Sequence, residues 1–218
     1  MEITQFTATI DHTNLKPDAT QEDIVKLCAE ANEFSFAAVC INPWHVSHAA
    51  HLLEDSQVRV AVVAGFPLGA TTTATKVFEA GEAVQNGARE VDLVINVAAL
   101  KEGSTRFVSD EISRVRSAIE GVFLKVILET GLLDVEEKRL AVRIAVDSGA
   151  DMLKTSTGFF GGATEDDVTL LKELAPQLGI KASGGIRDAE FALRLLAAGA
   201  TRLGTSSAIQ IIAKLQEK

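Results

Sequence analysis

The feature that most restricts the fold of this chain is a recurring unit, in which a helix end with glycine and alanine is followed by a short apolar run. The clearest copies are NGAREVDLV (86–94), SGADMLKTS (148–156) and AGATRLGTS (198–206). Glycine commonly ends a helix, and apolar or β-branched runs of this length are typical of strands. The recurrence therefore predicts one strand–helix unit that is used repeatedly.

Eight apolar runs follow one another along the chain, at residues 8–13, 37–42, 58–66, 90–96, 123–130, 150–157, 179–185 and 200–207. Between them, apolar residues recur at three- and four-residue spacing, which predicts helices. The clearest of these helices are at residues 21–34, 73–87, 135–149 and 189–199. Strands that alternate with helices pair in parallel, because each crossover places a helix on a face of the sheet.

Two parallel architectures fit this order: a (β/α)8 TIM barrel and an open doubly wound sheet. The 218 residues give about 27 residues per unit, which is compact but sufficient for the barrel. The first strand-to-helix turn, DHTNLKPDAT (11–20), lacks the Gly-x-Gly-x-x-Gly pattern of the open dinucleotide-binding sheet. No linker divides the chain. We therefore predict an α/β fold, a single TIM-barrel domain over residues 1–218.

The composition limits the partners of such a domain. The formal charge of −9 argues against general binding to nucleic acid or to a membrane surface, for which a basic patch is usual. Cys28 and Cys40 are too few for a disulfide framework or a thiolate metal cage. The chain has no secretory leader and no apolar run long enough for a membrane span, so we expect a cytoplasmic protein.

Polar side chains interrupt strands that a barrel interior would fill with valine, isoleucine and leucine. Because side chains alternate between the two faces of a strand, Lys154 shares a face with Met152 and Ser156, and Lys181 shares one with Ser183. The polar residues on such faces are Asp11, Cys40, Asp92, Lys125, Glu129, Lys154 and Lys181. The alternation does not decide whether these faces point inward. If they do, lysines and carboxylates meet on the barrel axis, which suits a catalytic site better than core filler.

Two lysines on neighbouring strands, Lys154 and Lys181, suggest chemistry that needs an amine. A protonated lysine is a poor nucleophile, but a second cation nearby or removal from water favours the neutral amine. A neutral amine adds to a carbonyl to form a Schiff base, which accepts electrons when an adjacent C–C bond breaks. Asp92 and the partner lysine are candidates for the proton transfers. This set of residues predicts imine-forming aldol chemistry.

Loops rich in glycine and hydroxyl groups follow the last three predicted strands. They are TSTGFFGGAT (155–164), ASGGIRD (182–188) and LGTSSA (203–208). Each loop leads into a helix, whose N-terminal N–H groups favour an anion. TIM barrels commonly bind phosphate in the loops after strands seven and eight. We therefore predict a phosphorylated small-molecule substrate, and we interpret Arg187 in the second loop as a surface residue.

The sequence contains no recognisable metal-binding pattern, and no cofactor is predicted. His45, His48 and His51 have helical spacing, but they lack paired carboxylates and a His-Glu-x-x-His motif, so we interpret them as a solvated helix face. The tripeptide DHT (11–13), at the end of the first strand, is better placed for a role in a site.

Motifs between about residue 9 and residue 208 resemble the deoxyribose-phosphate aldolase family and occur in the order of that family. They are DHTNLKPDAT, VCINPWHV, VVAGFPLGATTTATK, EVDLVINV, LKVILETGLL, ADMLKTSTGF, IKASGGIRD and RLGTSSA. The resemblance implies a (β/α)8 class I aldolase, a lyase that needs no metal. The implied reaction is the reversible cleavage of 2-deoxy-D-ribose 5-phosphate to D-glyceraldehyde 3-phosphate and acetaldehyde, in the catabolism of deoxyribose phosphates and deoxyribonucleotides. The resemblance also implies a homo-oligomer, either a dimer or a tetramer.

The resemblance assigns roles to individual residues. Lys154 in MLKTSTGF matches the Schiff-base lysine, Lys181 in IKASGGIR matches the second lysine that perturbs it, and Asp92 in EVDLVIN matches the carboxylate of the proton relay. The residues that match the substrate and phosphate site are Thr157, Gly158, Gly184, Gly185, Ser206 and Ser207. The supporting residues of the polar interior are Asp11, Cys40 and Lys125.

Two features depart from the pattern of the family. Phe159 follows the Thr-Ser-Thr-Gly turn, where some members have a lysine that reaches the phosphate. The chain also has no tyrosine, whereas some members use a C-terminal tyrosine in proton transfer.

Two other functions are compatible with these residues. One is a barrel isomerase or synthase that acts on another sugar phosphate without an imine. The other is a non-catalytic barrel that binds a phosphorylated metabolite. A trapped adduct on Lys154 argues against the first, and turnover argues against the second.

Overall fold

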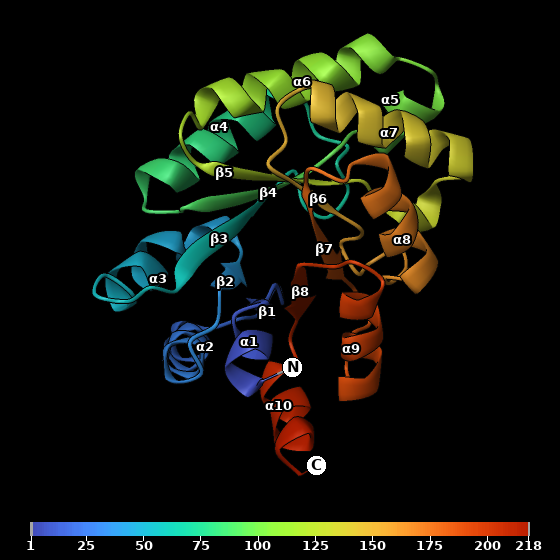
Figure 1. The fold of residues 1–218 in the computed structure, drawn as a ribbon. Helices are drawn as coiled ribbons and strands as arrows, with labels where there is room; N and C mark the ends of the chain where they lie inside the picture. The colour runs from blue at the N-terminus through green and yellow to red at the C-terminus, as the bar shows by residue number, and fades with distance from the viewer. Residues whose placement is uncertain (1, 218) are drawn as a thin grey trace.

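The computed structural model describes residues 2–217. Within this range eight parallel strands close into a barrel in chain order, and helices surround them (Figure 1). The strands are β1 (Ile10–Asn14), β2 (Ala38–Ile41), β3 (Arg59–Ala64), β4 (Glu90–Val94), β5 (Phe123–Ile127), β6 (Met152–Lys154), β7 (Gly179–Ser183) and β8 (Arg202–Thr205).

The helices connect successive strands on the outside of the barrel. They are α1 (Ile3–Thr7), α2 (Gln21–Glu33), α3 (Val46–Leu52), α4 (Thr73–Gln85), α5 (Val97–Lys101), α6 (Thr105–Ala118), α7 (Val135–Asp147), α8 (Glu165–Leu174), α9 (Ala189–Ala197) and α10 (Ala208–Gln216), with 3₁₀ turns η1 (Pro43–His45) and η2 (Thr130–Leu132). Helices α1 and α10 lie side by side, close to the junction of β1 and β8 (Figure 1). Between residues 2 and 217, no helix is both long and apolar enough to cross a membrane.

The closed barrel confirms the predicted fold class and excludes the open doubly wound sheet. Each of the eight predicted runs overlaps a strand, although β1 extends one residue beyond the first run, and the four clearest predicted helices correspond to α2, α4, α7 and α9. The sixth run, 150–157, is much longer than its strand, because the chain leaves the sheet after Lys154 and enters the Thr-Ser-Thr-Gly turn.

The strands are buried on both faces, which is why most of them read as nearly continuous apolar runs. Outward-facing residues such as Val39, Val91 and Val126 belong to the large core between the barrel and the helices. Cys40 and Val63 belong to a small separate cluster inside the barrel. The helices are thus held by apolar packing, and the barrel interior is left to a different kind of side chain.

The strand register settles which faces point inward. Asp92 pairs with Lys125, Lys154 pairs with Lys181, and Lys181 pairs with Arg202. Paired residues of neighbouring strands project to the same face of a sheet. These charged residues therefore project together, and their mutual contacts show that the shared face is the barrel interior.

Candidate active site

Asp92 of β4 is the centre of a buried ionic network inside the barrel. Its Oδ1 accepts a hydrogen bond from Lys125 Nζ at 2.7 Å, and its Oδ2 accepts hydrogen bonds from Lys154 Nζ and Lys181 Nζ, each at 2.7 Å. The side chain of Lys154 is 3% exposed and the other three are fully buried. The structure therefore brings the three predicted catalytic residues together at one carboxylate.

A second layer of charge continues this network toward the N-terminal ends of the strands. Asp11 bonds to both Lys181 and Arg202, and Glu90 lies 2.5 Å from Lys125. Arg202 Nη1 is 2.6 Å from Asp11 and 3.4 Å from Glu90. Sequence reasoning missed Glu90 and Arg202, although the alternation along their strands places both on the inward face. The predicted supporting roles of Asp11 and Lys125 in the polar interior fit these contacts.

Ionic attraction outweighs burial in this network. Burial alone raises the pKa of the Asp92 carboxyl, but the three lysines hold that pKa well below its usual range. Burial alone lowers the pKa of the Lys181 ammonium, but Asp11 and Asp92 hold that pKa well above its usual range. The same balance lowers the pKa of Asp11 and raises the pKa of Lys125. Asp92 is therefore an anion and Lys181 a cation at neutral pH.

Cys40 and Glu129 relate to the network in different ways. Cys40 Sγ lies 3.8 Å from Asp92 Oδ2, and burial raises the pKa of its thiol. Glu129, expected among the lysines, instead accepts hydrogen bonds from the backbone N–H of Thr157 at 3.2 and 3.3 Å, and burial raises the pKa of its carboxyl. Strand alternation does not extend to Glu129, because β5 ends at Ile127 and the backbone of Glu129 is left-handed, with a φ of 56°.

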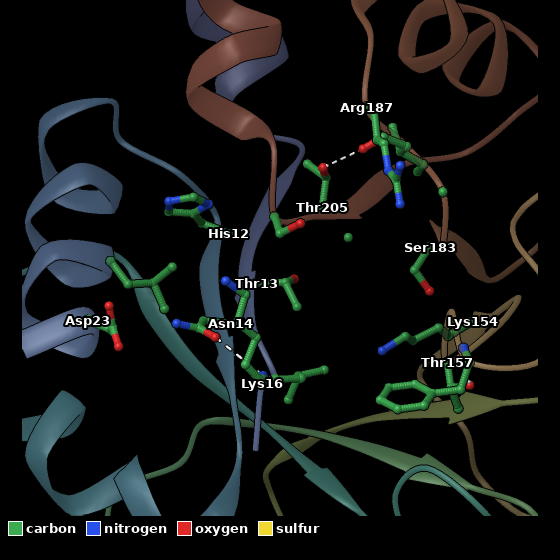
Figure 2. A pocket seen from close by; sticks show the side chains of 18 of the residues that line it. His12, Thr13, Asn14, Lys16, Asp23, Lys154, Thr157, Ser183, Arg187 and Thr205 are labelled. Atoms are coloured by element: carbon green, nitrogen blue, oxygen red, sulfur yellow. Dashed lines mark hydrogen bonds between the residues drawn. The ribbon is translucent and has the colours of Figure 1, made fainter. Parts of the chain in front are cut away.

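A cavity of about 530 Å³ opens above the network at the C-terminal ends of the strands (Figure 2). Lys154, Thr157 and Ser183 lie on one side of it, and His12 and Thr13 lie across from them (Figure 2). Among the described residues, Lys154 is the one member of the ionic network that lines the cavity. The network thus presents one amine to a ligand, at the end of the barrel where TIM-barrel enzymes have their active sites.

Four of the six predicted substrate and phosphate residues line the cavity: Thr157, Gly184, Gly185 and Ser206. Gly158 instead packs against the loop after β7. Gly158 and Gly184 have φ values of 91° and 94°, and a Cβ on Gly184 would lie 3.0 Å from Gly158 Cα. Side chains are excluded at both positions by conformation and by space, so Gly158 shapes the cavity without lining it.

Ser207, the sixth of these residues, immediately precedes α10, and its hydroxyl makes no capping hydrogen bond to that helix. Its backbone N–H donates to Thr205 Oγ1, which itself donates to Ile186 O and so joins the loops after β7 and β8. At α9, by contrast, the carboxylate of Asp188 caps the helix by accepting a hydrogen bond from Phe191 N. The start of α10 therefore suits an anion better than the start of α9.

The structure agrees only in part with the interpretation of the histidines from the sequence. His12 lines the cavity, as expected for the DHT tripeptide, and its Nε2 lies 2.7 Å from Glu30 Oε2. We interpreted His45, His48 and His51 as a solvated helix face. This interpretation is wrong for His45, which is only 5% exposed. His45 belongs to η1 rather than to α3, so the three do not share one helix. Within residues 2–217, no three His, Cys, Asp or Glu side chains are arranged to hold a metal ion.

Three cationic residues at the cavity, Lys16, Lys26 and Arg187, were not predicted as site residues. Arg187, interpreted as a surface residue, is exposed but also lines the cavity, and so does Lys16. The signal available for Lys16 was its place in the loop after the first strand, because such loops build the active face of a TIM barrel.

Comparison with known proteins identifies relatives of this chain. The family described as DeoC/LacD family aldolase matches residues 6–209. The chain is 53% identical to the deoxyribose-phosphate aldolase of Brevibacillus brevis, over 93% of each chain. It is also 53% identical to that of Carboxydothermus hydrogenoformans, over 96% of this chain and 94% of the relative. A solved structure, described as the unique tetrameric structure of deoxyribose phosphate aldolase from Aeropyrum pernix, matches with a TM-score of 0.90 and 35% identity, covering 99% of this chain and 92% of that one.

Proposed function

The chain belongs to the DeoC/LacD family of aldolases, and from this premise we propose that it is a class I aldolase that acts on 2-deoxy-D-ribose 5-phosphate through a Schiff base. The reaction is the reversible cleavage of this substrate to D-glyceraldehyde 3-phosphate and acetaldehyde. One observation carries the proposal: Lys154 lines the cavity and shares a single oxygen of Asp92 with a second lysine, Lys181.

Basic side chains outnumber carboxylates in the network. Four basic side chains that are buried or nearly so bond to three carboxylates: Lys125, Lys154, Lys181 and Arg202, with Asp11, Glu90 and Asp92. An uncompensated buried charge is costly. Lys125 and Lys181 each have two or more carboxylate partners, and arginine does not lose its proton. Within the described residues Lys154 has Asp92 alone, so it is the basic side chain of the network with the fewest carboxylate partners.

The proposed chemistry begins at Lys154. Its Nζ adds to the C1 aldehyde of the open-chain substrate, and loss of water gives a protonated imine. The C2–C3 bond then breaks, and its electron pair moves toward the imine to form an enamine. The C3 hydroxyl loses its proton and becomes the aldehyde of glyceraldehyde 3-phosphate. Protonation of the enamine at C2, followed by addition of water, releases acetaldehyde and restores the amine.

Asp92 and Lys181, together with bound water, serve the proton transfers. Asp92 holds the amine by a hydrogen bond and relays protons between it and water. The Lys181 ammonium bonds to the same Asp92 oxygen at 2.7 Å, and so it opposes a second positive charge at Lys154. None of the 218 residues is a tyrosine, so we assign these proton transfers to Asp92, Lys181 and water.

The phosphate of the substrate binds at the loops after β7 and β8. Gly184, Gly185 and Ser206 line this side of the cavity, and the start of α10 presents N–H groups that Ser207 does not cap. Thr157 lines the cavity beside Lys154 and contacts the sugar.

We also propose a homodimer or homotetramer, because the Aeropyrum pernix relative is described as tetrameric; light scattering of the purified protein gives the mass. The substrates are small phosphorylated sugars and aldehydes, with no nucleic-acid or membrane partner. The reaction links deoxyribose phosphates from deoxyribonucleotide catabolism to triose phosphates, which suits a cytoplasmic enzyme.

Borohydride reduction in the presence of 2-deoxy-D-ribose 5-phosphate tests the proposal. Reduction of the imine that acetaldehyde leaves on the enzyme should attach an ethyl group to Lys154, which peptide mass spectrometry detects. Lys125 and Lys181 serve as internal controls, because they are buried without lining the cavity and should stay unmodified. Turnover should persist with a chelator present.

Labelling that survives Lys154→Met would overturn the assignment of the nucleophile. Turnover without any trapped adduct would favour an isomerase or synthase that uses lysine and carboxylate as acid and base. Ligand binding without turnover would favour a non-catalytic barrel.

A further inference from the structure

The cationic side chains that line the cavity differ in whether they already have a partner. They are Lys16, Lys26, Lys154 and Arg187. Lys154 bonds to Asp92, and Lys26 lies 3.8 Å from Glu30. Across residues 2–217, no carboxylate lies within 4 Å of the charged end of Lys16 or Arg187. These two cations are therefore available to an anionic ligand.

The backbone of Lys16 is held by hydrogen bonds, whereas its ammonium group is available to a ligand. Its backbone N–H donates to Asn14 Oδ1 at 3.3 Å, and its carbonyl oxygen accepts hydrogen bonds from Ala19 N at 3.3 Å and Asn42 Nδ2 at 3.4 Å. These contacts hold the start of the side chain at the rim of the cavity. The flexible four-carbon stem of a lysine can then follow an anion to its bound position.

The closure of the barrel places the loop that carries Lys16 next to the loop after β8. Strand β1 pairs with β8, and His12 lies opposite Thr205 in their register. The loop that carries Lys16 and the loop that carries Ser206 therefore leave the sheet side by side. Figure 2 shows Lys16 across the cavity from Lys154. Lys16, Lys154 and Ser206 all line this cavity, so a substrate bound to Lys154 occupies the space that Lys16 borders.

The part of the rim formed by Phe159 offers no cation for this task. Phe159 lines the cavity at the end of the Thr-Ser-Thr-Gly turn, and its ring packs edge-on against Phe66 with the centroids 5.4 Å apart. This side of the mouth is therefore an apolar wall. The cavity lining also includes the carboxylates of Asp23 and Glu30, in a chain whose formal charge is −9. A phosphate dianion needs a compensating cation in such surroundings.

We infer that Lys16 pairs with the phosphate of the substrate and so determines the preference for phosphorylated over unphosphorylated sugars. This inference rests on the proposed function. It adds a specificity residue from the first strand–helix loop to a site whose other phosphate contacts come from the loops after β7 and β8. The positive charge that Phe159 cannot provide comes from the other side of the cavity.

The test is a ratio of specificity constants, kcat/KM for 2-deoxy-D-ribose 5-phosphate divided by kcat/KM for 2-deoxy-D-ribose. In Lys16→Met this ratio should fall about 10- to 100-fold, the worth of a hydrogen bond to a charged group, and the change should lie mainly in KM. Lys16→Arg should restore most of it, because the charge returns. In the wild type the ratio should also fall as salt screens the ion pair, and in Lys16→Met it should respond less to salt.

Lys26→Met is the matched control, since it removes a lysine from the same cavity lining but one that already lies near Glu30. Its ratio should equal that of the wild type. An unchanged ratio in Lys16→Met would overturn the inference, and so would a ratio that falls equally in both variants. A loss seen in Arg187→Met but absent from Lys16→Met would also overturn it and assign the role to the arginine.

Borohydride trapping with acetaldehyde, which has no phosphate, separates this inference from the proposed function. Labelling of Lys154 in Lys16→Met shows that the catalytic end of the site is intact, so that the ratio can be interpreted. Should Lys16→Met fail to fold, Lys16→Gln repeats the test with a polar side chain. No labelling and no turnover in the wild type would contradict the proposed function itself, whereas an unchanged ratio contradicts only the role of Lys16.

Discussion

Two lysines of this protein are buried beside carboxylates, but they occupy opposite sides of the barrel wall. Lys76 of α4 lies in the helix layer, where its Nζ donates to Glu111 Oε1 of α6 at 2.6 Å and to Val94 O at 2.9 Å. Lys154 lies inside the barrel, where it bonds to Asp92 and lines the cavity. Both side chains are at most 3% exposed.

The two sites balance their charges differently. Glu111 faces one lysine, and its second oxygen accepts a hydrogen bond from Thr73 Oγ1. Burial lowers the pKa of the Lys76 ammonium, and its interaction with Glu111 offsets this only in part. Around Asp92, by contrast, basic side chains outnumber carboxylates. The comparison teaches that burial and a lowered pKa do not make a lysine a nucleophile. Lys76 pairs with one carboxylate and lines neither described cavity, whereas Lys154 shares its carboxylate with other lysines and lines the cavity where a ligand can bind.

The largest expected effect is the loss of catalysis in Lys154→Met. We expect kcat to fall by about 10³-fold or more, because among the described residues Lys154 is the one amine of the ionic network that lines the cavity. The free energy of unfolding should change by less than ~1 kcal/mol, because Asp92 keeps Lys125 and Lys181 and the methionine occupies a similar volume. A coupled assay for glyceraldehyde 3-phosphate and urea unfolding measure the two effects. Activity within about tenfold of wild type would contradict the comparison.

Lys76→Met should show the reverse pattern. It leaves Glu111 buried without its cation, so the free energy of unfolding should fall by about 3–5 kcal/mol. The protein that remains folded should still be labelled at Lys154 in the borohydride experiment. Replacing both partners, with Lys76→Met and Glu111→Leu together, should recover most of the stability, because no charge is then left unpaired. Loss of labelling in folded Lys76→Met would mean that the helix layer takes part in the chemistry.

The smallest expected effect is a pH dependence of the free energy of unfolding that arises from the ionic network inside the barrel. The pKa of Asp11 is lowered in the folded state from its ordinary value of 3.8, so its ionised form contributes stability above that value. This contribution is lost as the pH falls through the folded-state pKa. Asp11→Asn should therefore lower the free energy of unfolding by about 2 kcal/mol at pH 7, and the difference should shrink below about pH 4.

Urea unfolding at pH 7, 5 and 3 measures this difference. Asp18→Asn, at an exposed position, controls for the loss of one negative charge from the chain. A difference between wild type and Asp11→Asn that stays constant over this range would show that Asp11 acts by packing rather than by charge.

The sequence by itself determined the order and type of the elements. The alternation of apolar runs with helical periodicity predicts parallel strands, and the recurring glycine–alanine unit predicts that each strand enters the sheet in the same way. It also determined which residues share a face, since alternation along a strand is a local property. Lys154, Lys181 and Asp92 were identified in this way, with the family motifs giving them separate roles.

Only the tertiary structure decided which face is the interior and which residues meet there. Closure of β8 onto β1 sets the register that brings Arg202 to Asp11, 191 residues away in the chain, and it places Lys16 and Ser206 on the lining of one cavity. Because β5 ends at Ile127, the alternation of side chains along the strand does not predict the direction of Glu129. Local periodicity describes each strand separately, whereas a charge network depends on contacts among several strands, and only barrel closure creates those contacts.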